Sequence, residues 1–391
     1  IFELAKALGE INRTRLSNYS EAVKAYNIAL SKRSGDISTR TVIAELYEHE
    51  QKWELAIAQH REILRLDIRQ INSLHKLFRL FIGQTRYDEA WCVAQALVCL
   101  RHARDDEQEF YGQHHSRRLG DIRKHLENDH WAFLVHTKKS PLMDRLFESL
   151  YWYNAPAMMM NHKGYGVHKR KDLLQPNEQT AFNSVLDFVS RVTRFERLSC
   201  YVAPSGVNGL RSMNTEPPGI LVGQDMQHSV GMKALVFSIS KLLFMMTPHA
   251  LMSTLDEDYD SRRNRLKIII FTLMRMAGIE VADFDTGLVD VYRKIDDGDL
   301  NKINNLLNEM QTDQRTHLDV SRWLEGLDHT ANRLGFLLCN DLVEATQAIR
   351  NETMLMSRAS IADRIQELIL FSISEEYFTL RKGLGITIRT S

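Results

Sequence analysis

The chain has 391 residues, 44% of them hydrophobic and 26% charged, which are ordinary values for a globular protein and exclude a disordered tail, a fibrous protein and a disulfide scaffold. Lysine plus arginine and aspartate plus glutamate number 50 each. This balance argues against a protein whose main task is to bind nucleic acid or an anionic membrane. A chain of this length usually forms more than one domain.

The four cysteines contain no Cys-x-x-Cys pair, which fits a reducing compartment and predicts a cytoplasmic protein without a zinc ribbon. No apolar run reaches the roughly 18 residues of a membrane span, and no signal peptide is recognisable. Because the chain opens on Ile1 and is periodic at once, we expect it to belong to a longer chain or a larger assembly.

A spacing of 34 residues relates the first three segments of the chain. Ala22, Ala56 and Ala90 recur at that spacing, and each follows an amphipathic helical pattern. An aromatic residue stands three positions before each alanine and a large apolar residue eight positions after it: Tyr19, Trp53 and Tyr87, then Leu30, Leu64 and Val98. We interpret residues 3–36, 37–70 and 71–104 as three helix–turn–helix units.

This pattern resembles the tetratricopeptide repeat, and the resemblance implies an α-solenoid. In that fold the small alanine lets two antiparallel helices approach closely, and the large apolar residue packs on the next repeat. Two positions depart from the family pattern. Ile68 stands where a closing proline is usual, and Phe78 replaces a small residue in the first helix of the third repeat.

The first helix of each pair would line the concave face of such a solenoid. The register set by the alanines places eight residues there: Ser38, Thr41, Glu45, Glu48, Asn72, His75, Arg79 and Ile82. The resemblance implies that a partner protein binds this mixed polar face. The alternative is that these side chains are simply solvated.

The 34-residue spacing ends after the third unit. The charged stretch 105–127 is expected to form a capping helix around Phe110 and then a linker, followed by a mainly helical α+β domain over 128–391. Helical patterns cover 142–152, 178–195, 228–246, 261–277, 299–312, 315–338, 341–350 and 360–382. Strand patterns cover 198–203 and 219–223, and the proline- and glycine-rich stretch between them suggests a hairpin.

Three stretches of this second domain, 215–223, 323–342 and 370–385, are similar to the uncharacterised C-terminal domain of large bacterial tetratricopeptide proteins of the myxobacterial kind. That family has no established activity to carry over. The similarity therefore implies a relationship of fold and no chemistry.

The order of strand pair, helix and later helix with Ala-Asn-Arg-Leu-Gly also resembles the zinc peptidases that carry a His-Glu-x-x-His helix. The resemblance places Lys241 and Met245 at the two histidine positions, Leu242 at the general base and Asp328 at the third metal ligand. An ammonium repels a dication, a thioether is a poor Zn²⁺ ligand, and leucine accepts no proton. The resemblance thus implies a degenerate site, a pseudoenzyme with no metal and no cofactor.

We therefore expect a non-catalytic scaffold or adaptor that binds a protein partner through the first helices. The alternative is a divergent zinc-peptidase-like hydrolase whose metal site is lost or remodelled. The basic stretch 162–171 carries a Gly-x-Gly but lacks the strand and helix context of a phosphate-binding loop, so it is more typical of an exposed loop. We expect no nucleic-acid partner and no membrane span.

Overall fold

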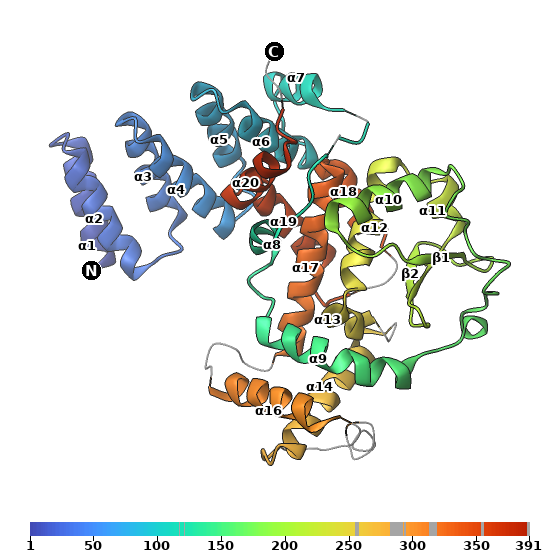
Figure 1. Cartoon of the computed structure of the whole chain (residues 1–391). Helices are drawn as coiled ribbons and strands as arrows, with labels where there is room; N and C mark the ends of the chain where they lie inside the picture. The colour runs from blue at the N-terminus through green and yellow to red at the C-terminus, as the bar shows by residue number, and fades with distance from the viewer. Residues whose placement is uncertain are drawn as a thin grey trace. The chain divides into compact units, whose positions relative to one another are not determined.

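The computed structural model describes residues 1–116, 118–120, 122–254, 258–281, 292, 295–312, 319–352 and 356–388. These residues form mainly helices and one small three-stranded sheet, which confirms the prediction of a mainly helical chain with a small sheet (Figure 1). Contacts divide the chain into two compact units. Unit 1 comprises Ile1–Ser116, Ile369–Lys382 and the chain from Thr387 onward, and unit 2 comprises Arg117–Leu368 and Gly383–Ile386.

Unit 1 begins with three helix pairs in the three predicted segments (Figure 1). The pairs are α1 (Phe2–Thr14) with α2 (Tyr19–Lys32), α3 (Ile37–His49) with α4 (Trp53–Leu66), and α5 (Ile71–Gly83) with α6 (Tyr87–Cys99). Helix α7 (Asp105–His114) follows where a capping helix was expected. The turn within each pair contains a left-handed residue, Ser17, Gln51 or Thr85, and these three also lie 34 residues apart. The backbone therefore repeats with the same period as the sequence.

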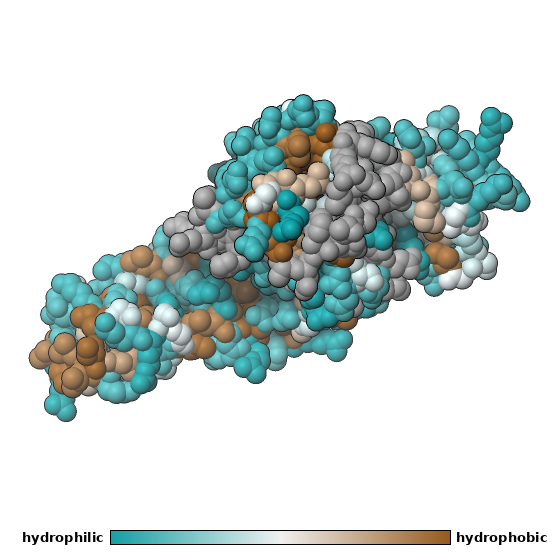
Figure 2. Space-filling view, turned by 90° about the horizontal axis from the view of Figure 1, so that it is seen from below, coloured by the Kyte–Doolittle hydropathy of each residue, from teal (hydrophilic) through white to brown (hydrophobic). Residues whose placement is uncertain are grey.

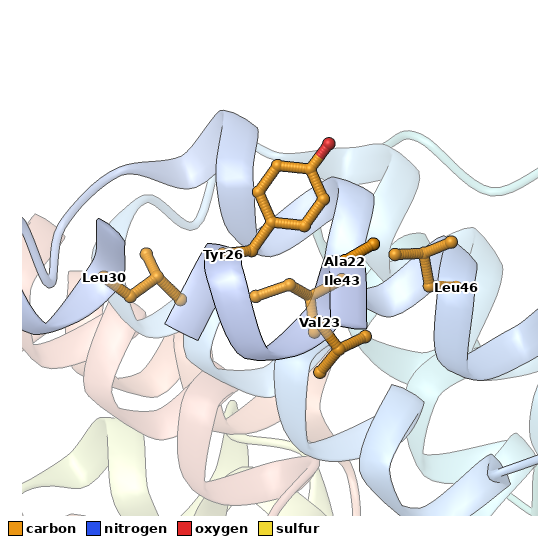
Figure 3. Packing of buried hydrophobic residues seen from close by; sticks show 6 residues of the cluster. All are labelled: Ala22, Val23, Tyr26, Leu30, Ile43 and Leu46. Atoms are coloured by element: carbon orange, nitrogen blue, oxygen red, sulfur yellow. The ribbon is translucent and has the colours of Figure 1, made fainter. Parts of the chain in front are cut away.

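The two helices of a pair pack closely because their facing residues are small. Ala22, Ala56 and Ala90 are completely buried. In the first pair, a Cβ atom on Gly9 would lie 2.6 Å from the ring of Tyr26, so only glycine permits this approach. A core between α2 and α3 then joins the first pair to the second through Ala22, Val23, Tyr26, Leu30, Ile43 and Leu46 (Figure 3).

The last helices depart from the prediction of one helix over 360–382. The chain forms α19 (Ile361–Ser372) and α20 (Glu375–Leu384), because the Ser374 hydroxyl accepts a hydrogen bond from the Tyr377 amide and begins a new helix. The sequence assigned all of 128–391 to the second domain, whereas contacts place residues 369–382 in unit 1. The buried Arg381 forms two 2.8 Å hydrogen bonds to Asp88 of α6 and lies over the Trp91 ring.

Unit 2 holds the remaining elements. Its helices are α8 (Asn128–Leu134), α9 (Pro141–Met158), α10 (Ala181–Thr193), α11 (Gln224–His228), α12 (Met232–Met245), α13 (Pro248–Leu251), α14 (Tyr259–Met276), α16 (Asp297–Thr312), α17 (Val320–Cys339), α18 (Leu342–Arg350) and most of α19, with short 3₁₀ turns at His162–Tyr165 and Met252–Thr254. The predicted helix over 315–338 starts outside the described residues, at 315–318.

The small sheet has the strand order β1-β3-β2. Strands β1 (Ser199–Val202) and β3 (Gly219–Val222) lie within the predicted ranges, but they pair in parallel, so they do not form the hairpin that the sequence suggested. A third strand, β2 (Leu210–Met213), lies between them in the chain and pairs antiparallel with β3. The prolines and glycines around β2 hid it, because turn residues on both sides made the whole stretch resemble a single loop.

Helices α12 and α17 form the centre of unit 2. A Cβ atom on Gly335 of α17 would lie 2.9 Å from the carbonyl oxygen of Phe237 on α12, so the two backbones come unusually close there. Both helices carry polar side chains that are buried by this packing. Across the described residues, no helix by itself is long and apolar enough to cross a membrane. Among them, only Met232–Met245 and Pro248–Thr254 taken together, a pair bent by 88°, reach the length and apolar composition of a membrane span.

Candidate functional site

Ion pairs connect the first helix of each pair to the next. Lys6 of α1 donates to the Ser38 hydroxyl at 2.8 Å and lies 3.3 Å from a carboxylate oxygen of Asp36, the N-cap of α3. Lys76 of α5 donates to Glu48 of α3 at 2.8 Å. Through these lysine side chains α1 is linked to α3, and α3 to α5.

Three of the eight residues predicted to face a partner protein are exposed and have no side-chain partner among the described residues. Glu45, Asn72 and Arg79 have exposed side chains and make no side-chain hydrogen bond or ion pair to another described residue. Ser38 is exposed and donates to Asp36 at 2.9 Å, while the half-buried Thr41 donates to a backbone carbonyl of its own helix. Ile82 is half-buried.

Glu48 has a structural role within unit 1. One carboxylate oxygen lies 3.0 Å from His60 Nε2 and the other accepts from Lys76. Burial alone would raise the pKa of Glu48, but the hydrogen bonds from His60 and Lys76 outweigh burial and lower it. The carboxylate is therefore charged and already paired.

His75 does not face a partner, which corrects the expectation from the sequence. Its side chain is buried, and Nδ1 lies 2.6 Å from a carboxylate oxygen of the buried Glu107 on α7. The helix after the third pair therefore covers this position. Glu107 belongs to a charged stretch that resembled a solvated surface, so no sequence signal linked the two residues.

The second candidate region is a buried ionic cluster between α12 and α17. Lys241 Nζ donates to Asp328 Oδ1 at 2.7 Å and to Asn332 Oδ1 at 2.9 Å, and it lies 2.8 Å from Glu352 Oε1. Asp328 also accepts from the Ser357 hydroxyl at 2.8 Å. The structure thus brings together two of the four degenerate metal-site positions, Lys241 and Asp328.

The charges of this cluster balance one another. Arg364, which is 1% exposed, donates to Glu352 at 2.5 Å, so two cations face two carboxylates. Burial would raise the pKa of Asp328, but Lys241 and Arg364 lower it. Burial would likewise lower the pKa of Lys241, but Asp328 and Glu352 raise it. Both partners therefore stay ionised.

A cavity of about 340 Å³ adjoins the cluster. Lys241, Leu242 and Met245 line it from α12, and Glu352 lines it from the segment after α18. Asn332, Glu352, Ser357 and Arg364 were not identified from the sequence. Asn332 stands four residues after Asp328, so two polar groups one turn apart in an apolar stretch were an available signal. The other three come from distant segments and carried no local pattern.

Within the described ranges, no three His, Cys, Asp or Glu side chains are arranged so as to hold a metal ion. No protein-family model matches the chain, and no curated protein matches its sequence.

Proposed function

We propose that this chain is a non-catalytic scaffold or adaptor of the tetratricopeptide type, which binds a partner protein through the exposed side of α1, α3 and α5. The observation that carries the proposal is a set of exposed polar side chains, Glu45, Asn72 and Arg79, that make no hydrogen bond or ion pair to another described residue; Glu45 and Arg79 lie 34 residues apart, at the same position of their repeats. Other charged residues of these helices, such as Lys6, Glu48 and Lys76, already have partners within the unit.

The contrast between the exposed side chains without partners and the charged residues already paired within unit 1 supports a surface that is available to a partner protein. Glu45 and Arg79 carry opposite charges on adjacent first helices, yet neither pairs with a described residue. A partner with complementary charges would gain both attraction and correct register from them. Neighbouring positions on the same helices are occupied by internal contacts, which hold the surface in one shape.

The test is charge reversal in the full chain. Glu45→Lys and Arg79→Glu, made separately, should each weaken a purified partner complex by about tenfold, which equals about 1.4 kcal/mol. Glu21→Lys on α2, which removes only an exposed pair with Lys24, is the matched control. Circular dichroism should show unchanged helix content in all three variants. Unchanged affinity in both test variants would contradict the proposal.

The Lys241 cluster supports the non-catalytic part of the proposal. The Lys241 ammonium uses its hydrogen bonds on Asp328, Asn332 and Glu352, and Arg364 lies beside the same carboxylates. A dication at this point would be repelled by two buried positive charges. We infer that the ammonium serves here as the structural cation that joins the surrounding helices.

The cluster also changes how the hydrolase alternative must be tested. Asp328→Ala would leave Lys241 buried with one carboxylate fewer, so it would lower stability whatever the role of Asp328. Loss of function in that variant would therefore not show that Asp328 is a metal ligand. Metal analysis of the purified native chain is the discriminating measurement, because stoichiometric zinc would favour the hydrolase and contradict the scaffold proposal.

A further inference from the structure

The segment between α9 and α10 carries a concentration of positive charge on unit 2. Lys163, Lys169, Arg170 and Lys171 are all exposed, and none makes a side-chain hydrogen bond or ion pair with another described residue. We call residues 162–171 the basic loop. Figure 1 draws this segment in green on the same side as β1, and that side is mainly hydrophilic in the space-filling view (Figure 2).

The positive charge of the basic loop is not neutralised locally. Several exposed cations elsewhere on unit 2 have a carboxylate partner, such as Arg358 and Lys302, which lie 2.7 Å from Asp260 and Asp299 respectively. The basic loop itself contains no acidic residue. Asp172, which follows it directly, uses its carboxylate to accept a 2.7 Å hydrogen bond from the backbone amide of His168.

The base of the basic loop is held firmly against the small sheet. Val167 is 2% exposed and belongs to a core cluster with residues of β1, β2 and β3. The Tyr165 hydroxyl accepts a hydrogen bond from the Asn214 amide at 2.8 Å, and the Val202 amide donates to the Asp172 carbonyl at 2.7 Å. The cations therefore project from a backbone of fixed shape, which reduces the conformational entropy lost when a ligand binds.

The basic loop also folds back on itself. Gly166 has a left-handed backbone with φ of 73°, and a Cβ atom there would lie 3.0 Å from the Pro204 side chain, so glycine suits both the turn and the close approach. Burial and then the positive charge of Lys169 lower the pKa of His162. Because that charge acts on His162, the two ends of the loop are close together, and its cations share one small area of surface.

We propose that the basic loop binds a short acidic segment of a protein, whose aspartate or glutamate side chains pair with Lys169, Arg170 and Lys171. This docking surface is independent of the exposed side of α1, α3 and α5. Exposed ion pairs are individually weak and are screened by salt, so several of them together give binding that is modest and strongly dependent on ionic strength.

The surroundings of the basic loop favour an acidic protein segment over other anions. Nucleic-acid binding usually involves a basic excess and exposed aromatic rings for base stacking, whereas the chain has equal numbers of acidic and basic residues and Tyr165 packs on the core cluster around Val167. Membrane binding by a basic surface usually adds an apolar face. Here Val167 is buried, and next to the loop in the chain Met160 alone is an exposed large apolar residue.

The first test uses the full chain and two labelled peptides with blocked ends. The acidic probe is Ser-Asp-Glu-Asp-Glu-Ser, and the neutral probe is Ser-Asn-Gln-Asn-Gln-Ser. Fluorescence polarisation at low salt should show that the acidic peptide binds about tenfold tighter or more, and that raising the salt to several times the physiological concentration removes the difference. No saturable binding of the acidic peptide, or equal binding of both probes, would overturn the proposal.

Variants of the basic loop provide the second test. The double variant Lys169→Glu, Arg170→Glu should weaken the acidic peptide about tenfold, whereas Lys169→Arg, Arg170→Lys keeps the charge and should keep the affinity. Arg275→Glu on α14 is the matched control, because Arg275 is exposed and has no side-chain partner among the described residues. All variants should melt at the same temperature, since exposed side chains of this kind add little stability. Undiminished affinity in the first double variant would contradict the proposal.

The last arm identifies the kind of anion. The probes are a short oligothymidylate and vesicles containing phosphatidylserine, with inorganic phosphate as competitor. Oligothymidylate or vesicles that bind more tightly than the acidic peptide, and lose that binding in Lys169→Glu, Arg170→Glu, would make nucleic acid or a membrane the occupant and overturn the proposal. Displacement of the peptide by phosphate at equal charge concentration would also overturn it, because the loop would then be an unselective anion site.

The proposal for the basic loop and the proposed function are tested separately. Glu45→Lys and Arg79→Glu should leave the affinity for the acidic peptide unchanged, because neither residue belongs to unit 2. Failure of the peptide experiments thus removes the basic loop as a docking surface and leaves the proposed function to its own test. Loss of peptide binding in Arg79→Glu would place the acidic segment on unit 1 and overturn the inference.

Discussion

Lys241 and Asp328 are 87 residues apart in the chain, yet their charged groups lie 2.7 Å apart with both side chains almost completely buried. The pair ties α12 to α17 at the centre of unit 2. A buried charge is costly unless a partner compensates it, so the two residues depend on each other. This dependence leads to the first prediction.

Lys241→Met should lower the free energy of unfolding by about 3–5 kcal/mol, because it leaves Asp328 and Glu352 facing Arg364 alone. Urea denaturation at pH 7 measures the change. Lys302→Met, which removes an exposed partner of Asp299, is the control and should shift stability by less than about 1 kcal/mol. The double variant Lys241→Met, Asp328→Leu should recover part of the lost stability, because it removes both charges of the pair and leaves Glu352 paired with Arg364. A fully additive double variant would show that the pair is not coupled.

His136 should make unit 2 sensitive to mild acid. Burial, reinforced by the nearby Arg333, lowers its pKa from 6.5 to about 3. A depressed folded pKa means that the unfolded chain takes up the proton first, so stability is complete above pH 6.5 and is lost as pH falls toward 3. The loss from this residue at pH 5 is at most about 2 kcal/mol.

Urea denaturation at pH 7 and pH 5 tests this dependence. His136→Gln should make the difference in stability between the two pH values smaller, whereas the exposed His168→Gln should leave that difference unchanged. Equal pH dependence in His136→Gln and the native chain would show that the histidine is already protonated in the folded state.

Gly335→Ala should destabilise unit 2 by about 1–3 kcal/mol. The added methyl group would meet both the ring and the backbone oxygen of Phe237, so α12 and α17 would have to separate. Thermal unfolding measures the loss. Gly112→Ala in α7 is the contrast, since nothing lies within 4 Å of its Cβ position and alanine favours helix; this variant should be neutral or slightly more stable.

Arg381→Leu should release α20 from unit 1. The substitution leaves the Asp88 carboxylate with the Ile388 amide as its remaining described partner, at a cost of about 3–5 kcal/mol. Hydrogen exchange of residues 375–384 should then become faster. Lys382→Leu changes the exposed neighbour and should leave exchange as it is. Slow exchange in Arg381→Leu would mean that apolar contacts such as Phe81 with Phe378 hold the helix without the ion pair.

Local and periodic features of the fold were predictable from the sequence. The helix pairs were predictable from the recurring alanines Ala22, Ala56 and Ala90, because two helices can approach closely only where a small residue recurs at a fixed spacing. Most helices of unit 2 followed from apolar periodicity. The break at Ser374 was missed, because a serine N-cap inside a continuous apolar pattern looks like an ordinary helical position.

Features that depend on distant segments were not predictable in the same way. His75 has the position of an exposed residue in the repeat, and only the placement of Glu107 shows that it is buried. The resemblance to zinc peptidases selected Lys241 and Asp328 as related positions, but not the ion pair between them. Arg364 and Glu352 complete that cluster from segments whose sequence gives no sign of it. Buried charge is decided by tertiary packing, which a single sequence does not reveal.

The left-handed turn residues Ser17, Gln51 and Thr85 have a wider consequence. None of them is glycine, and each holds a conformation that costs a non-glycine residue about 1 kcal/mol or more. The hairpin geometry therefore imposes the conformation, and three different side chains tolerate it. Each turn is a place where glycine would relieve strain without altering the exposed side chains of α1, α3 and α5. Unit 1 thus contains three independent sites at which evolution or an engineer can raise its melting temperature while leaving recognition untouched.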